Sequence, residues 1–331
     1  MKIRKVLTVA KATAVAHTIQ GLLKYHGLKN KKLRLPFHDS ISVCVKELTT
    51  TATVEFDPRY SEDTIQINEA VAKGIEAQRV LVVVDALRKL KRTKEHAKIV
   101  SRNNLEKAKG VGFSAAAFAS IAFATSNALS LKIDLPHLSE IARLGAGSAS
   151  RSLVGGFSIW YANRNGRSWA RQLDDGTRIK LAMGIVPLAS AVKTDLAHEE
   201  STSSPFFTAR VKTVKAAVPK MVHAIKAGNL AEVCKLAEAD SLSLHAVTMT
   251  GRQGLVLVAP ETISVIQRVR TLREEKGIPV WYSMDTGPSV FLNTQPECLD
   301  KVCDDIESNV NIPVIRSGVG GAASVVDDHL F

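Results

Sequence analysis

The chain has 331 residues, of which 45% are hydrophobic and 23% charged, and its net charge at pH 7 is +12. This composition excludes long disordered stretches, and the length predicts two domains that share one cleft. The positive charge indicates an anionic partner, but aromatic residues at 5% offer few surfaces on which nucleic acid bases can stack. We therefore expect a small phosphorylated ligand and no nucleic acid partner.

The four cysteines form no CxxC pair and no histidine stands at zinc-ligand spacing, so the sequence predicts neither disulfides nor a metal site. Lys11 interrupts the amino-terminal apolar run too early for a signal peptide, and no run reaches the length of a membrane span. The expectation is a cytoplasmic protein without a membrane partner.

The first half of the chain mixes predicted strands and helices. β-Branched runs predict strands at 6–10, 40–45 and 49–56, and helical spacing follows at 68–91. A strand near 97–101, a glycine-containing loop and an alanine-rich helix at 114–129 come next. We expect a loop at 144–152 and a strand at 156–161.

The second half begins with a predicted strand at 178–186. Predicted helices follow at 205–227, 230–242 and 259–276, and predicted strands at 280–283, 289–292 and 313–316. No internal repeat is present. The pattern predicts an α+β protein with domains at 1–170 and 171–331.

Two segments of the first half carry side chains suited to anions. Lys24 and Tyr25 adjoin a polar loop, where an ammonium group and a phenol could hold an anion, or where they are a solvated lysine and a core tyrosine. Ser148 and Arg151 lie on a small-residue turn that could hold a carboxylate or a phosphate. The alternative for the second segment is a flexible turn followed by a helix cap.

Asp285 and a glycine pair provide two further candidates. Asp285 follows a predicted strand, where its carboxylate could accept a hydroxyl proton or oppose a developing cation, or where the residue merely forms a turn. Gly110, Gly112 and Ser114 precede the alanine-rich helix and have the outline of a phosphate loop. A tight turn is the more usual reason for such a glycine pair.

Two weaker candidates lie in the second half. The polar stretch that contains Lys193, His198 and Ser204 either crosses a cleft and contacts a substrate or begins a helix. Asp240 and His245 stand at helical spacing, which is also typical of one surface face of a helix.

Four blocks, in this order along the chain, together resemble the mevalonate diphosphate decarboxylase family. They are GLLKYHG at 21–27, LPFHDSIS at 35–42, GAGSASR at 145–151 and MDTGP at 284–288. The resemblance covers nearly the whole chain. It implies the GHMP kinase superfamily, with a ribosomal-S5-like amino-terminal domain, a ferredoxin-like carboxyl-terminal domain and an active site between them.

The resemblance also implies roles for five residues. Asp285 matches the catalytic aspartate of the family and Lys24 its partner lysine. Tyr25 and Ser148 match substrate contacts, and Arg151 matches the arginine that grips the substrate carboxylate. These groups suit a reaction in which a 3-phosphate departs, positive charge grows at C3 and CO2 is released.

A first departure from the family concerns the 5-phosphate. Members that use a diphosphate have a lysine where this chain has Leu28, which favours a single 5-phosphate and is similar to the archaeal phosphomevalonate decarboxylase branch. Lys193, His198 and Ser204 are the residues that we expect to contact this phosphate.

A second departure concerns the phosphate loop. ATP-using relatives carry a serine-rich loop, but here Phe113, Ala115 and Ala116 leave Ser114 as the one hydroxyl. The pattern is similar to mevalonate 3,5-bisphosphate decarboxylase, an enzyme of isoprenoid biosynthesis whose substrate is already phosphorylated at C3. We therefore expect no nucleotide or metal cofactor, with isopentenyl phosphate, CO2 and phosphate as products.

Two alternatives stay open. One is a phosphomevalonate or diphosphomevalonate decarboxylase that uses ATP and Mg2+, with its altered loop still binding nucleotide through backbone N–H groups. The other is a basic, non-catalytic binding protein with the same fold. Relatives in the family suggest a homodimer.

Overall fold

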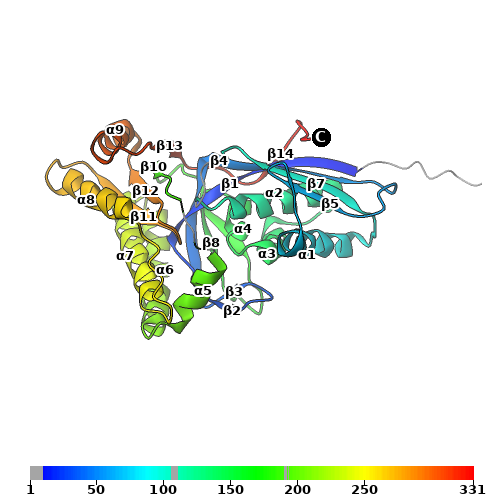
Figure 1. The fold of residues 1–331 in the computed structure, drawn as a ribbon, viewed down its shortest axis with the longest axis horizontal. Coiled ribbons are helices and arrows are strands. Elements are labelled where there is room, and N and C mark those ends of the chain that lie inside the picture. Colours follow the sequence, from blue (N-terminus) through cyan, green and yellow to red (C-terminus); the bar gives the residue numbers. More distant parts are fainter. Residues whose placement is uncertain (1–9, 106–110, 190–191, 193) are drawn as a thin grey trace, which may run out of the picture.

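The computed structural model describes residues 10–105, 111–189, 192 and 194–331 (Figure 1). Its largest feature is a sheet built on two long antiparallel strands, β1 (Ala10–Leu23) and β4 (Ser40–Phe56). Their register runs from Ala10 opposite Phe56 to Leu23 opposite Ile41. The sequence predicted two short strands in place of β4. The strand predicted at 6–10 lies outside the described residues, except for Ala10.

The other strands of this sheet flank the long pair. Its path runs β14-β1-β4-β7-β5-β6, and β4 also pairs with β8, which pairs with β9. Their bounds are β5 (Thr64–Ile67), β6 (Ala70–Val71), β7 (Ala97–Asn103), β8 (Phe157–Trp160), β9 (Ala170–Asp174) and β14 (Ser324–Val326). A small hairpin of β2 (Leu28–Asn30) and β3 (Leu35–Pro36) stands apart from this sheet.

Four helices pack against one face of the large sheet and form its core. They are α1 (Gly74–Lys91), α2 (Phe113–Ala128), α3 (Leu135–Gly145) and α4 (Ala149–Val154). The predicted alanine-rich helix is confirmed as α2, and its small side chains allow close contact with β1 and β4. The loop predicted at 144–152 is wrong, because α3 begins after a capping Asp134 and α4 follows almost at once.

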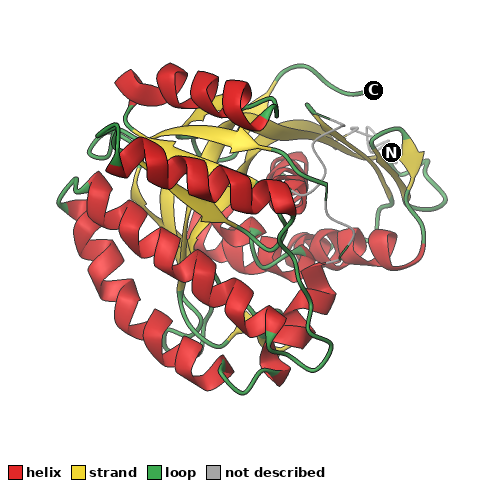
Figure 2. Ribbon diagram, turned by 60° about the vertical axis from the view of Figure 1, so that its left-hand side comes forward, coloured by secondary structure: helices red, strands yellow, loops and turns green. Residues whose placement is uncertain are grey.

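The second sheet is antiparallel, with the order β11-β12-β10-β13. Its strands are β10 (Ala182–Val186), β11 (Val280–Met284), β12 (Val290–Thr294) and β13 (Ile315–Gly318). The remaining helices are α5 (Thr194–Ser203), α6 (Phe207–Lys226), α7 (Leu230–Met249), α8 (Pro260–Glu274), η1 (Pro296–Cys298) and α9 (Leu299–Val310). In Figure 2 helices lie in front of this sheet, and the α+β class is confirmed.

The two sheets are joined by a shared core and by buried hydrogen bonds. One apolar cluster takes residues from β1, β4 and β8 as well as from β10, α6 and α7. The Gln20 amide on β1 donates to Ser283 Oγ at 2.7 Å and to Asn293 Oδ1 at 2.8 Å. Residues near the end of β1 are therefore fixed against the β11–β12 hairpin.

The predicted boundary near residue 170 stays a prediction. Strand β9, which begins at Ala170, pairs with β8 in the large sheet, and β14 from the last part of the chain pairs with β1. Across the described ranges, no helix combines the length and the apolar character that crossing a membrane requires.

Candidate active site

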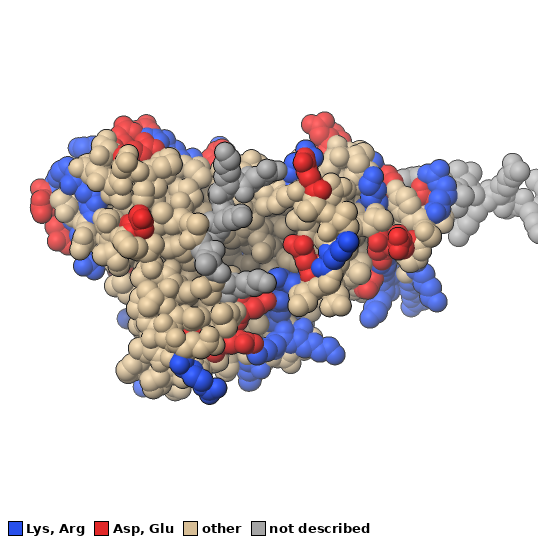
Figure 3. Space-filling model, in the orientation of Figure 1, with Lys and Arg blue, Asp and Glu red and all other residues tan. Residues whose placement is uncertain are grey.

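A cleft of about 590 Å³ lies where β1, α2, α4, α5, α7 and the β11–β12 turn meet. Figure 3 shows the molecule hollowed near the middle of one face. The cleft brings together eight residues that the sequence singled out, namely Lys24, Tyr25, Gly112, Ser114, Ser148, Arg151, His198 and Asp285. Segments far apart in the chain thus supply a single site.

Of the remaining predicted residues, Ser204 lies elsewhere, and two are not described. Ser204 is not among the residues that line the cleft, and its hydroxyl lies 2.7 Å from the Thr250 hydroxyl and accepts from the Phe206 N–H. These contacts are those of a turn at the start of α6. Lys193 and Gly110 lie outside the described residues.

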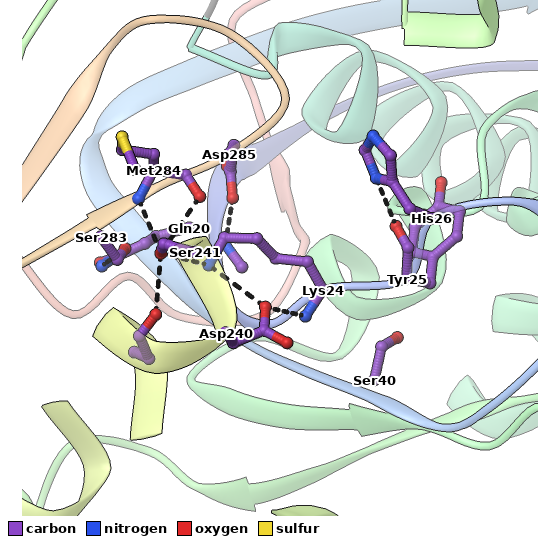
Figure 4. A network of polar contacts seen from close by, with 12 residues as sticks. Gln20, Lys24, Tyr25, His26, Ser40, Asp240, Ser241, Ser283, Met284 and Asp285 are labelled. Atoms are coloured by element: carbon purple, nitrogen blue, oxygen red, sulfur yellow. Dashed lines mark hydrogen bonds and ion pairs between the residues drawn. The ribbon is translucent and has the colours of Figure 1, made fainter. Parts of the chain in front are cut away.

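Lys24 is buried between two carboxylates, Asp240 from α7 and Asp285 from the β11–β12 turn (Figure 4). Its Nζ lies 3.6 Å from Asp240 Oδ2 and donates to Ser241 Oγ at 3.1 Å. Its backbone N–H also donates to Asp240 Oδ2 at 2.9 Å. Burial lowers the pKa of Lys24, and both carboxylates raise it. The two acids therefore favour the ammonium form.

Asp240 is neutralised from its other side by Arg210 of α6. Arg210 Nη2 donates to Asp240 Oδ1 at 3.1 Å and to the Lys24 carbonyl at 3.0 Å. The interpretation of Asp240 and His245 as a surface face is wrong, because they are only 6% and 3% exposed. Helical spacing could not show that β1 packs against this face of α7.

Asp285 is held by hydrogen bonds to its side chain and to its backbone. Gly21 N–H donates to Oδ1 at 2.9 Å, and His245 Nε2 donates to the Asp285 carbonyl at 3.1 Å. Burial raises the pKa of the Asp285 carboxyl, while Lys24 and the Gly21 amide oppose this shift. A Cβ on residue 21 would lie 2.8 Å from Asp285 Oδ1, so the close approach requires glycine.

Arg151 on α4 is a buried cation that lacks an anionic partner. Its Nη1 donates to Ser40 Oγ at 2.8 Å, and its guanidinium lies over the rings of Tyr25 and Trp160. Its buried Nε has no hydrogen-bond partner, and no carboxylate of the described chain lies within ion-pair distance. Burial lowers the pKa of Arg151, and an arriving carboxylate would offset this cost.

The cleft contains two more arginines, which the sequence did not single out. Arg34 comes from the turn between β2 and β3, and Arg79 from α1. Arg79 donates to the Gly145 carbonyl from Nε at 3.0 Å and from Nη2 at 2.8 Å. Burial and then the charge of Arg34 lower the pKa of Arg79, so the two cations lie close enough to repel. In the sequence both resemble ordinary surface arginines.

His198 on α5 completes this arginine-lined part of the cleft. Its ring stacks on Tyr25 with centroids 5.0 Å apart, and its Nδ1 accepts from the Gly27 N–H at 3.2 Å. Burial lowers the pKa of His198 to about 4, so the ring is neutral at pH 7. Because Nδ1 accepts, the proton resides on Nε2, which can donate to an anion.

The start of α2 forms another part of the wall and offers few polar side chains. Gly112 is the N-cap residue with φ of +79°, and Ser114 supplies the one hydroxyl of residues 111–116. Ala115 and Ala116 are buried in the core. Backbone N–H groups at this helix start could hold a phosphate. Within the described ranges, no group of acidic, histidine or cysteine side chains suited to a metal occurs.

Two family models match the chain. Residues 16–170 match the diphosphomevalonate decarboxylase-like N-terminal domain, and residues 194–317 match the mevalonate 5-diphosphate decarboxylase C-terminal domain. A phosphomevalonate decarboxylase from Haloferax volcanii is 40% identical over 96% of this chain and 98% of its own length. A diphosphomevalonate decarboxylase from Saccharomyces cerevisiae is 29% identical over 86% of this chain and 78% of its own length.

Solved structures agree with these matches. Mevalonate diphosphate decarboxylase from Staphylococcus aureus superposes with a TM-score of 0.90 and 26% identity, covering 97% of this chain and 99% of that one. The enzyme from Enterococcus faecalis, which was studied for its ATP binding, gives a TM-score of 0.88 and 26% identity over 97% and 100%. The predicted GHMP kinase-type fold is confirmed.

Proposed function

Because the chain belongs to the diphosphomevalonate decarboxylase family, and so to the carboxy-lyases of the mevalonate pathway, we propose a specific reaction for it. The enzyme removes CO2 and the 3-phosphate from mevalonate 3,5-bisphosphate and releases isopentenyl phosphate, without ATP. One contrast carries the proposal: Lys24, Asp285 and Arg151 form a complete charged set, whereas the start of α2 has lost the hydroxyls of a triphosphate loop.

The proposed reaction is a fragmentation in which no proton is transferred. The C3–O bond breaks and its electron pair leaves with the phosphate, so positive charge develops at C3. The electrons of the C1–C2 bond then form the C2–C3 double bond, and the carboxylate leaves as CO2. Atoms and electrons balance without a co-reactant.

Each charged group of the site matches one part of this transition state. The Lys24 ammonium stabilises the departing phosphate, and the Asp285 carboxylate opposes the charge at C3. The Arg151 guanidinium, whose Nε has no hydrogen-bond partner, pairs with the substrate carboxylate. These interactions strengthen as charge separates, so they favour the transition state over the bound substrate.

A single 5-phosphate suits the rest of the cleft. Leu28 takes the place of the lysine that diphosphate-using members carry, while Arg34, Arg79 and neutral His198 supply two cations and one N–H donor. The 40% identical relative from Haloferax volcanii is named for a monophosphate substrate, which supports this choice.

The second candidate is an ATP-dependent phosphomevalonate decarboxylase. Two observations favour it: the name of that relative, and the position of Gly112 and Ser114 in the wall of the cleft. ATP with Mg2+ would then supply the phosphoryl group for the 3-hydroxyl. Asp285 would accept the hydroxyl proton.

Two parallel reactions distinguish these candidates. Purified enzyme is given mevalonate 3,5-bisphosphate without nucleotide in one, and mevalonate 5-phosphate with ATP and Mg2+ in the other. We expect CO2 and phosphate from the first alone. CO2 with ADP from the second reaction alone would establish the ATP-dependent enzyme. If no phosphorylated mevalonate is turned over, the result favours the non-catalytic binding protein.

The setting and assembly of the enzyme belong to the same proposal. We expect a cytoplasmic homodimer that acts on a small phosphorylated substrate and binds neither nucleic acid nor membrane. Sedimentation of the purified chain tests the assembly, and a monomer at assay concentration that turns over at the full rate would contradict it.

A further inference from the structure

Arg34 occupies an unusual backbone position for an arginine. Its φ is +49°, in the left-handed region that favours glycine and asparagine. The neighbouring Lys31, Lys32 and Leu33 are exposed, yet the Arg34 side chain is only 16% exposed and lines the cleft. A strained position that directs a cation into a cleft is typical of a functional residue.

The ion pair of Arg34 is a weak one. Its Nη1 lies 3.5 Å from Asp195 Oδ1, which is longer than a direct hydrogen bond. The Asp195 side chain is 62% exposed in the first turn of α5, so solvent and salt screen the pair. Within the described chain no other carboxylate pairs with Arg34.

The other arginines of the cleft are already committed. Arg79 uses two donors on the Gly145 carbonyl. Arg151 donates to Ser40 Oγ and, in the proposed function, binds the substrate carboxylate. Arg34 and Arg79 also repel each other, and an anion between them would relieve that repulsion. Of the cations in this part of the cleft, Arg34 can therefore exchange its present partner for a ligand most easily.

We propose that Arg34 is the residue that binds the single 5-phosphate of the substrate. In the empty site Asp195 pairs with the Arg34 guanidinium, until the phosphate displaces Asp195. The inference rests on the proposed function, since it needs a 5-phosphorylated substrate. Leu28 and Arg34 lie on the same small hairpin, in which Leu28 pairs with Pro36. The charge lost at Leu28 is thus replaced from the turn of that hairpin.

Arg34→Asn is the central test, because asparagine tolerates positive φ and the hairpin backbone is preserved. Dissociation constants for mevalonate 5-phosphate and for mevalonate are measured by NMR titration. We expect about 10- to 100-fold weaker binding of the phosphate ester, the range for a charged hydrogen bond, and less than about twofold change for mevalonate. Arg34→Lys should fall in between.

Lys32→Asn is the matched control, because it removes the same charge from the same turn at an exposed position outside the cleft lining. It should bind both ligands like the unchanged protein. If Arg34→Asn weakens the binding of both ligands equally, Arg34 only supports the hairpin. If it weakens the binding of neither ligand, Arg34 does not contact the substrate. Either result overturns the inference.

Asp195→Asn tests the exchange itself. Removing the carboxylate should strengthen binding of mevalonate 5-phosphate about two- to fivefold, a small gain because the pair is exposed. Weaker binding of mevalonate 5-phosphate would contradict the proposal that the phosphate displaces Asp195 from Arg34. Neither titration needs turnover, so this inference can fail while CO2 release succeeds, and the proposed reaction can fail while the titrations succeed.

Discussion

Two parts of the same cleft differ in how they are built. In the catalytic part, Lys24 and Asp240 are buried, Asp285 is half-buried, and each has partners on other elements. At the start of α2, Gly112 and Ser114 are exposed, and the described wall offers mainly backbone donors. The difference supports the proposed fragmentation, which needs fixed charges and no triphosphate.

Under the proposed function, this difference means that one of two reaction steps has been lost. Phosphorylation of the 3-hydroxyl needs a nucleotide and a base, whereas the fragmentation needs only fixed charges. If the proposal holds, the substrate arrives already phosphorylated at C3, and a separate kinase-type reaction supplies that 3-phosphate.

The largest expected effect is that of Asp285→Asn. The amide can still accept from the Gly21 N–H, so the fold should survive while the charge that opposes the C3 cation is gone. We expect about a 1,000-fold lower kcat, comparable with the loss of a strong electrostatic group. Asp57→Asn, a buried aspartate outside the cleft lining, is the control. A near-normal rate of the Asp285→Asn variant would show that Asp285 takes no part in the mechanism.

Arg151→Lys should be the next most severe change. Lysine keeps the charge but loses the planar fork that binds a carboxylate through two hydrogen bonds. We expect about a 100-fold lower kcat/KM in steady-state assays of CO2 release. Arg88→Lys changes a buried arginine paired with Asp63 and Asp85 and should leave kcat/KM unaltered. Unchanged kinetics in Arg151→Lys would refute the carboxylate assignment.

Asp240→Asn should shift the pH dependence of the rate. Asp240 raises the pKa of Lys24 against the effect of burial, so its loss lowers that pKa and the ammonium form is lost at lower pH. The alkaline limb of the kcat/KM profile should therefore move to lower pH. Arg210 also loses its carboxylate, so we expect about 3–5 kcal/mol lower stability.

Glu238→Gln separates these two effects. Glu238 lies on the same helix and pairs with Arg273 at 2.8 Å, so its loss also weakens the fold. It should leave the pH profile in place. If both variants shift the profile alike, the shift reflects stability and not the charge on Lys24.

The smallest expected effect is that of Ser114→Ala. This change removes the one hydroxyl of residues 111–116, yet turnover of mevalonate 3,5-bisphosphate should change less than about twofold, because no step of the proposed reaction uses it. Steady-state CO2 release measures it. A loss above tenfold with intact folding would show that the start of α2 still serves catalysis.

Part of the fold could be predicted from local pattern. Strongly periodic or compositionally distinct segments, such as α2, α6 and β11, were found. Strand β1 was missed beyond Ala10, since its alanines have weak strand preference and its pairing with β4 and β14 keeps it extended. Helix α9 was missed, although its buried Val302 and Ile306 stand one helical turn apart.

The candidate site divides in the same way. Lys24, Arg151 and Asp285 stand in sequence blocks that resemble a family, so their convergence was expected. Asp240 and Arg34 could not be selected, because what distinguishes them is burial against β1 and a cleft formed by distant segments. Partners supplied by tertiary packing leave no local pattern in the sequence.

The proposed reaction is tested most directly by following mevalonate 3,5-bisphosphate by 31P NMR, with nucleotide removed and EDTA present. We expect the 3-phosphate signal to be replaced by inorganic phosphate, one for one with the CO2 released. An unchanged bisphosphate signal, from enzyme that converts mevalonate 5-phosphate once ATP and Mg2+ are added, would contradict it.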